Sequence, residues 1–468
     1  MTEVRPARRI RHYSTPMTHD PHRDLQRQRP GLRAATPLER IAALADPGSA
    51  HFFAPAGASP HLGRFGIAAQ DDDGIVTARV GVHGQPMLVA AQDERFLAGS
   101  VGERHAIALQ ALFACARRER PAAVVLLLAS GGVRLHEANA AEVTLARVLA
   151  ALLDARAEGI AVVAVGVGDV FGGTSVLACA ADRLAMLPGT RIGLSGPKVL
   201  ESVHGKWELD AEDWRDVDAV FGAAARNAAG LVDLLSDGAD ALRGWVPHAA
   251  QQRADFAVHV RATQARLHAR TAGEPAHAAP FDALPCFDGA VPVDNGGRLW
   301  LRPECWLTRP CPGATLGPAD TLALDAALLD HLAPSPAALP NPVVLVEDSA
   351  GHAVSRGAEM RFVSQFLAHH AAVLALLRAQ GRQLVGLLAG VGHSAAFFAN
   401  ALQAPFLYAL ASSRVVAMEP SAIARVTGLD AATLVENDPL LGQPVRHFAL
   451  HGGATAVIAD ASIASLGL

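Results

Sequence analysis

Two pairs of glycine-rich turns recur about 220 residues apart in this chain, and the spacing within each pair is kept. Each turn follows a short apolar run, a pattern typical of a buried strand that leads through a tight turn into a helix. The segments with this pattern are residues 123–134, 162–175, 343–352 and 384–394. The repeat therefore predicts two related α/β domains in tandem.

The similarity between the halves continues beyond the turns. Residues 183–194 align with residues 406–417, so the copies share more than isolated glycines. The chain has 468 residues, of which 51% are apolar, and it is long enough for two cores of ordinary size. A single domain of this length is not expected.

Composition shifts place the expected domain boundaries. Residues 1–35 hold eight arginines and three acidic residues without apolar periodicity, which predicts a disordered basic leader or, alternatively, a docking arm for an acidic partner. The pattern that begins at Thr36 predicts the start of a helix, with a Thr cap followed by Pro and Glu. We expect domains at 36–270 and 293–468, joined by a Pro-, Ala- and Gly-rich linker at 271–292.

Charge and cysteine content exclude several classes of protein. The formal net charge of −5 provides no electrostatic footprint for nucleic acid, and no apolar run approaches the roughly 18 residues that span a bilayer. The five cysteines are odd in number and irregularly spaced, and the N-terminal region lacks the apolar core of a secretory signal. We expect a cytoplasmic protein without nucleic-acid or membrane partners.

The glycine turns indicate a specific chemistry. A glycine turn before a helix lets backbone N–H groups approach a ligand oxygen, and the helix N-terminus adds partial positive charge. Two such turns on neighbouring strands supply two converging donors, an arrangement that stabilises an enolate oxygen. Neither half contains a dinucleotide-binding or P-loop motif. The alternative is that these glycines serve only tight connections and helix packing.

The motifs around the turns resemble a known enzyme family. Residues 131–139, 171–173 and 191–197 closely resemble the beta subunit of biotin-independent malonate decarboxylase, and the similarity covers roughly residues 36–245. In the second half, the turns at 348–352 and 390–397 are similar to the gamma subunit of the same enzyme, and residues 403–404 and 424–427 continue that match. The chain looks like a fusion of the two subunits.

The resemblance implies a fold and a reaction. The expected fold is two tandem crotonase-like domains, each a spiral of ββα units, of the acyl-CoA carboxyltransferase type. The implied reaction is decarboxylation of a malonyl thioester to an acetyl thioester. An acyl carrier subunit would present the malonyl group on a phosphopantetheine-type arm, and an acyl-carrier transferase subunit would load it. No cofactor is expected to be bound covalently to this chain, and a homo-oligomer is left open.

Two other functions stay open at this stage. One is a biotin-dependent acyl-CoA carboxyltransferase, because the absence of a Met-Lys-Met biotin-attachment motif does not exclude biotin on another subunit. The other is a non-catalytic subunit that binds acyl or carrier groups.

The site residues follow from the motif positions. Those expected in catalysis are Gly132, Val133, Gly172, Gly173, Gly392, His393 and Ser394. Those expected to bind the substrate are Gly131, Arg134, Gly196, Gly351 and His352. The oxyanion donors would be the N–H groups of Gly132 or Val133 and of Gly172 or Gly173. His352 and His393 are candidates for the acid that protonates the carbanion.

Several residues have a second interpretation. Arg134 and Glu137 are three residues apart and are predicted to form either a surface pair or a group that orients the turn or the substrate. The chain departs from the family pattern at Lys198, where an acid is expected, and at Ala395, where a second glycine is expected. The cysteines of the second half, Cys286, Cys305 and Cys311, lack the paired spacing of a zinc site and are expected to be free.

Overall fold

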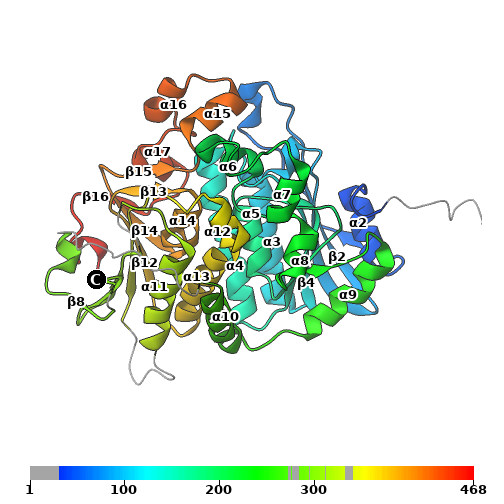
Figure 1. Cartoon of the computed structure of the whole chain (residues 1–468), viewed down its shortest axis with the longest axis horizontal. Coiled ribbons are helices and arrows are strands. Elements are labelled where there is room, and N and C mark those ends of the chain that lie inside the picture. The colour runs from blue at the N-terminus through cyan, green and yellow to red at the C-terminus, as the bar shows by residue number, and fades with distance from the viewer. Residues whose placement is uncertain (1–30, 272–275, 277–283, 295, 311–312, 333–340) are drawn as a thin grey trace, which may run out of the picture.

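Two seven-stranded sheets flank a central layer of helices in this chain (Figure 1). A computed structural model describes residues 31–271, 276, 284–294, 296–310, 313–332 and 341–468. The expected α/β class is confirmed, and no strand pairing joins the two sheets in the described part of the chain. No helix among these residues is both long and apolar enough to cross a membrane.

The first sheet lies within the N-terminal half. Its strands, in spatial order, are β1 (His51–Phe52), β2 (Ile75–Val82), β3 (Gln85–Gln92), β4 (Ala123–Ser130), β5 (Val162–Val170), β6 (Arg183–Met186) and β7 (Asp233–Leu234). The pairs at the β1 end are antiparallel, and all pairs from β3 to β7 are parallel. The carboxyl ends of the parallel strands therefore meet at one edge of the sheet.

The second sheet repeats this plan. Its strands, in spatial order from the opposite end, are β8 (Val291–Pro292), β9 (Leu299–Leu301), β10 (Trp306–Thr308), β11 (Val343–Glu347), β12 (Leu384–Leu388), β14 (Phe406–Leu410) and β16 (Ala456–Ile458). Two antiparallel pairs again precede a run of parallel pairs. A small parallel sheet joins β13 (Val391–His393) to β15 (Arg414–Val416). The sequence repeat is thus a repeat of topology.

Helices connect the strands and fill the space between the sheets. In the first half these are α2 (Pro37–Leu44), α3 (Glu103–Glu119), α4 (Ala138–Ala157), α5 (Gly173–Ala180), α6 (Pro197–His204), α7 (Trp214–Phe221), α8 (Ala223–Ala228), α9 (Ala239–Gln251) and α10 (Phe256–Arg270). In the second half they are α11 (Pro318–Asp330), α12 (Arg356–Met360), α13 (Val363–Ala379), α14 (Ser394–Ala399), α15 (Pro420–Thr427), α16 (Ala431–Asn437) and α17 (Val445–Leu450).

One apolar core is shared by both halves. It includes Leu149 of α4 and Val176 of α5 together with Leu367 and Leu374 of α13, all fully or almost fully buried. Separate clusters cover the outer face of each sheet. Because parallel strands are buried on both faces, they read as continuous apolar runs, as β4 does. Packing between α5 and α13 and between α4 and α13 joins the halves into one body.

The described residues at the expected domain boundaries are folded against the neighbouring elements. The helix predicted at Thr36 is confirmed as α2, because Thr36 and Glu39 form a reciprocal capping box. Leu32, within the expected leader, is buried against this helix, whereas residues 1–30 lie outside the described residues. Within the expected linker, Cys286 and Phe287 pack on the outer face of the second sheet. Most of 271–283 lies outside the described residues.

Candidate active site between the two halves

The two glycine turns of the first half lie in direct contact. Gly132 has φ +100° and Gly172 has φ +61°, conformations that favour glycine. A Cβ atom on Gly132 would lie 3.2 Å from the Cα of Gly172, and one on Gly172 would lie 2.9 Å from the Cα of Gly132. Backbone therefore packs on backbone at this point, and a side chain at either position would push the turns apart.

Hydrogen bonding separates the candidate donors of the first half. The N–H of Gly132 donates to the Ser130 hydroxyl at 3.1 Å, and that of Gly172 donates to the Leu194 carbonyl at 3.0 Å. The N–H groups of Val133 and Gly173 have no acceptor within the described part of the chain. Gly173 is the first residue of α5, where the helix dipole favours negative charge. Only Val133 and Gly173 are thus free to bind an oxyanion.

The first turn of the second half has the same backbone arrangement. The Gly351 N–H approaches the Ser349 hydroxyl at 3.4 Å, as Gly132 does with Ser130. His352 forms a parallel bridge with Leu316, and Val133 forms the equivalent bridge in the first half. The His352 N–H consequently lacks an acceptor among the described residues, like the Val133 N–H.

The second turn of this half differs from its counterpart. The His393 ring lies against Gly351, with Nδ1 3.1 Å from the position of a Cβ on that glycine. Ser394, the first residue of α14, has φ +49°, which is strained for a residue with a side chain. Gly392 is buried against the ring of Phe397. Ala395, which stands where a glycine is expected, is buried as the second residue of α14.

A loop of the first half connects the two sets of turns. The Ser195 hydroxyl and His352 Nε2 are 3.0 Å apart, and the preceding Leu194 carbonyl is the acceptor for Gly172. The imidazole of His352 therefore lies next to the first-half turns, although it belongs to the second half. Burial lowers the pKa of His352 to about 4, so this ring is neutral near pH 7. Its buried Nδ1 has no partner in the described structure.

Glu359 of α12 holds the same loop in place. Its carboxylate accepts the Ser195 N–H at 2.6 Å and the Leu194 N–H at 3.2 Å. Arg226 donates to the Glu359 carbonyl at 2.7 Å. Burial raises the pKa of Glu359 to about 7, against the effect of these donors. Gly196 is the N-cap of α6, where an added Cβ would meet no other atom within 4 Å, and Lys198 is exposed.

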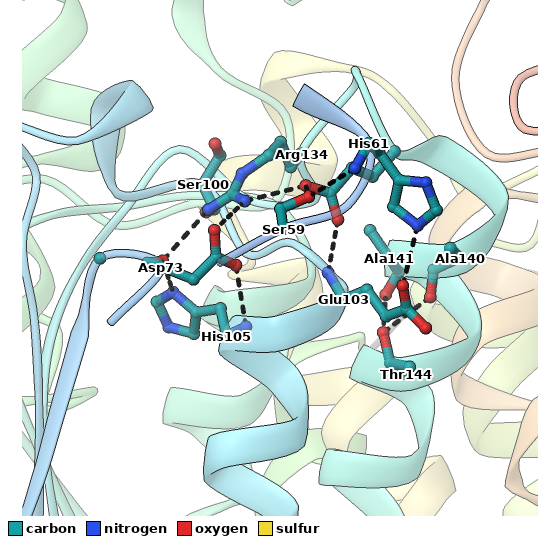
Figure 2. Close-up of polar contacts among 12 residues, drawn as sticks. Ser59, His61, Asp73, Ser100, Glu103, His105, Arg134, Ala140, Ala141 and Thr144 are labelled. Carbon is teal, nitrogen blue, oxygen red and sulfur yellow. Dashed lines mark hydrogen bonds and ion pairs between the residues drawn. The ribbon is translucent and has the colours of Figure 1, made fainter. Parts of the chain in front are cut away.

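Arg134 is not a surface residue, contrary to one of its two expected roles. Its guanidinium is fully buried and donates to Asp73 at 2.5 Å, to Glu137 at 2.9 Å and to the Ser100 carbonyl at 3.0 Å. Figure 2 shows Arg134 enclosed by Asp73 and Ser100, with His105 beyond Asp73. Arg134 therefore fixes the loop behind the first turn and is not available to bind a substrate carboxylate.

A second buried network supports the second-half turn. Asn400 donates to Glu347 at 2.7 Å and its amide oxygen lies 3.2 Å from His370 Nε2, while His370 Nδ1 lies 2.6 Å from Asp325. Burial lowers the pKa of His370, but the hydrogen bonds and charges of Asp325, Asn400 and Glu347 together raise it above its usual value. Glu347 ends β11, two residues before Ser349. Both turns are thus backed by buried polar groups, the ion pairs of Arg134 in the first half and, in the second half, the Asn400 amide beside the His370–Asp325 pair.

Sequence patterns did not single out several of these residues. Ser195, Glu359 and Asp73 contact site residues that are 61 to 165 positions away in the chain. The one local signal is the Ser-x-Gly pattern, which occurs at Ser130 and again at Ser349.

Metal-binding groups do not gather at this site. No cluster of three or more potential metal ligands occurs among the described residues. Cys286 and Cys305 are buried free thiols, and Cys311 lies outside the described residues.

Two family models match separate parts of the chain. Residues 33–225 match the carboxyl transferase domain, and residues 312–462 match the malonate decarboxylase gamma subunit. Malonyl-S-ACP:biotin-protein carboxyltransferase of Malonomonas rubra is 33% identical over 230 residues, which cover 45% of this chain and 71% of that protein. The acetyl-coenzyme A carboxylase carboxyl transferase beta subunit of a Synechococcus strain is 30% identical over 37% of this chain and 54% of its own length.

Solved structures include similar chains. One chain of a Pseudomonas malonate decarboxylase hetero-tetramer in complex with malonate is 32% identical, with a TM-score of 0.47, and the match covers 55% of this chain and 97% of that chain. A chain of the Pseudomonas malonate decarboxylase hetero-dimer is 30% identical, with a TM-score of 0.39, over 47% of this chain and 88% of that chain.

Proposed function

Because this chain belongs to the carboxyltransferase family of the malonate decarboxylases and so acts on carboxyl groups, we propose that it decarboxylates a malonyl thioester. The products are carbon dioxide and the acetyl thioester, as expected of a carbon–carbon lyase. The observation that carries this proposal is the pair of free N–H groups at Val133 and Gly173, on two turns that touch each other.

These two donors suit the difficult step of the reaction. When the bond between the α-carbon and the carboxylate breaks, its electron pair moves toward the thioester carbonyl, and negative charge develops on that oxygen. The N–H groups of Val133 and Gly173 would donate to this oxygen, with additional stabilisation from the N-terminus of α5. Each such donor typically contributes a factor of roughly 10²–10³ to the rate.

The second half would hold the departing carboxylate and supply a proton. Its turns at Gly351, Gly392 and Ser394 would face the carboxylate, and the His352 N–H is free for the same purpose. The carbanion must gain one proton to become the acetyl group. The neutral His352 ring would give its one N–H proton to the carbanion and regain a proton from solvent water, and it suits this transfer better than His393 because it reaches Ser195 beside the first-half turns.

Other subunits would deliver the substrate. In this proposal an acyl carrier subunit presents malonyl on a phosphopantetheine-type arm, and an acyl-carrier transferase subunit loads that arm. This chain itself would hold no covalent cofactor, and it would act in the cytoplasm. Release of carbon dioxide should therefore require the malonyl-loaded carrier and should not occur with free malonate.

The name of the Malonomonas rubra relative supports a second candidate function. That protein is described as transferring the carboxyl group to a biotin protein. The same oxyanion site would serve this reaction, because both reactions pass through the same enolate. The two functions differ in the fate of the carboxyl group, which either leaves as free carbon dioxide or appears on biotin.

The test uses the purified chain with a malonyl-loaded acyl carrier labelled in the free carboxyl group. We expect labelled carbon dioxide without any biotin protein, and a Gly132→Ala variant should lose about 10²–10³ in kcat because its Cβ separates the turns. Gly244→Ala in α9, where a Cβ meets nothing within 4 Å, should keep full activity. A folded Gly132→Ala variant with normal turnover would disprove the oxyanion role. Label recovered only on an added biotin protein would favour the second function.

A further inference from the structure

We propose that a cleft between α10, α13 and the edge of the first sheet binds a small organic dianion. The cleft has a volume of about 770 Å³, within the ordinary range for ligand pockets. Its lining includes Cys179 and Ala180 at the C-terminal end of α5, whereas the glycine turns lie at the other end of that helix. The cleft is therefore separate from the candidate active site.

Two of the four arginines that line the cleft are already neutralised. Arg156 forms an ion pair with Asp182 at 2.8 Å, and Arg183 forms one with Asp233 at 2.6 Å. These are the only acidic side chains in the lining, as far as the described residues show. Two positive charges therefore remain without a counter-ion.

The two charges without a carboxylate partner belong to Arg266, which is exposed at the mouth of the cleft, and to Arg270, which is half-buried with its guanidinium 5.4 Å from the centre of the Phe366 ring; they lie one turn apart on α10. Arg266 donates to the Thr263 hydroxyl at 2.8 Å, and Arg270 donates to the Gln365 side chain at 2.5 Å. Neither lies within 4.0 Å of a carboxylate of the described chain, and Nη2 of Arg270 is buried without a partner there. Burial lowers the pKa of Arg270, and the charge of Arg266 lowers it further. An anion bound between them would relieve both effects.

The other polar groups in the cleft add no charge, and the His369 ring presents an acceptor at Nδ1, because its Nε2 donates to the Gln264 amide oxygen at 2.6 Å. Burial lowers the pKa of His259 to about 4 and also lowers that of His369, so both rings are neutral near pH 7. His369 has a buried Nδ1 without a partner in the described structure. Two guanidinium groups match two carboxylates or one phosphate, since each presents paired N–H donors to two oxygens. The charge count favours a dianion over a monoanion.

Binding to the intact chain tests this site. We would titrate succinate, inorganic phosphate and acetate at constant ionic strength and follow binding by calorimetry and by the melting temperature. At least one of the two dianions should bind, and acetate should bind at least tenfold more weakly. Preference for succinate or phosphate then tells whether the natural ligand carries carboxylates or a phosphate.

Matched variants locate the binding. Arg266→Gln and Arg270→Gln should each weaken dianion binding by about tenfold or more, and Arg266→Lys should weaken it less. Arg261→Gln, an exposed position on the same helix that does not line the cleft, should leave binding unchanged. Circular dichroism confirms folding, which Arg266→Gln should not disturb because Arg266 is exposed and its one described hydrogen bond is to Thr263. Absence of dianion binding to the unmodified chain, or binding to both Gln variants that is as tight as binding to the unmodified chain, would overturn the proposal.

Discussion

The first-half and second-half turns share one backbone arrangement but differ in the groups that pack against their glycines. In the first half, Gly132 and Gly172 bring backbone against backbone. In the second half, the His393 ring occupies the space above Gly351, and Ser394 adopts the left-handed conformation that a glycine would accept more easily. The first pair of turns therefore exposes N–H groups, whereas the second also presents side chains.

This difference indicates a division of labour within one repeated unit. A backbone donor cannot change its charge, so the first half is suited to a constant task such as binding an oxyanion. Imidazole and hydroxyl groups can exchange protons and adapt to a ligand, so the second half is suited to the leaving group and the proton. The buried supports differ as well, because Arg134 holds two carboxylates in the first half, whereas Asn400 links Glu347 to the His370–Asp325 pair in the second.

The largest expected effect concerns these supports. Arg134→Met leaves Asp73 and Glu137 buried without their counter-charge, and we expect it to lower the free energy of unfolding by about 3–5 kcal/mol. Asn400→Leu in the second half should cost about 1–3 kcal/mol, because it leaves hydrogen-bonding groups unpaired. Urea denaturation measures both values. As a control, Arg79→Met removes an exposed pair with Glu119 and should cost about 0–1 kcal/mol. Equal losses for Arg134→Met and Arg79→Met would contradict the ionic support.

A smaller effect should distinguish the turns themselves. A Cβ added to Gly351 meets the His393 ring at 3.1 Å, and a ring can move more readily than the backbone that opposes Gly132. We therefore expect Gly351→Ala to reduce kcat by about tenfold, compared with about 10²–10³ for Gly132→Ala. The measurement is carbon dioxide release from the malonyl-loaded carrier. If both variants lost activity equally, the two turns would be equivalent, and the proposed division of labour would be wrong.

The smallest expected effect concerns Glu142, which lies near Glu347 of the second-half support. Glu142 of α4 is buried, and burial, together with the nearby charge of Glu347, raises its pKa to about 8 from 4.5. The folded state then binds more protons than the unfolded state, so stability falls as the pH rises from about 4.5 to about 8. Glu142→Gln removes this loss, and we expect the variant to be more stable than the unmodified chain by about 1–2 kcal/mol at pH 8.5.

Urea denaturation at pH 5 and pH 8.5 checks this prediction, since the difference between the variant and the unmodified chain should widen with pH. A constant difference across this range would show that Glu142 does not titrate between these values. Glu436→Gln, at an exposed position, provides the control and should show no such trend.

Strands and turns could be predicted because their signals are local. The apolar run at 384–388 is β12 with the same bounds, and the run at 123–128 lies within β4, which extends to Ser130. The contact between the two first-half turns also follows from the sequence, because neighbouring parallel strands end at the same edge of a sheet. These features depend on residues within one strand-turn-helix unit.

The choice between adjacent amides could not be predicted, because it depends on distant acceptors. The Gly172 N–H donates a hydrogen bond to the Leu194 carbonyl, and nothing in the sequence of residues 171–175 indicates that bond. The burial of Arg134 likewise depends on Asp73, 61 positions earlier, whereas the sequence pattern shows only Glu137 three residues later. A local pattern thus located the site but could not tell which of its groups are free.

The shared core between the sheets has a consequence for how this protein is made. Separate subunits must find each other by diffusion, and their pairing weakens at low concentration. Here one polypeptide carries both partners, so they arise in equal number and meet at an effective concentration that the connecting segment sets, in the millimolar range for a short linker. Dilution should therefore not separate the half that binds the oxyanion from the half that contains the candidate proton donors, His352 and His393.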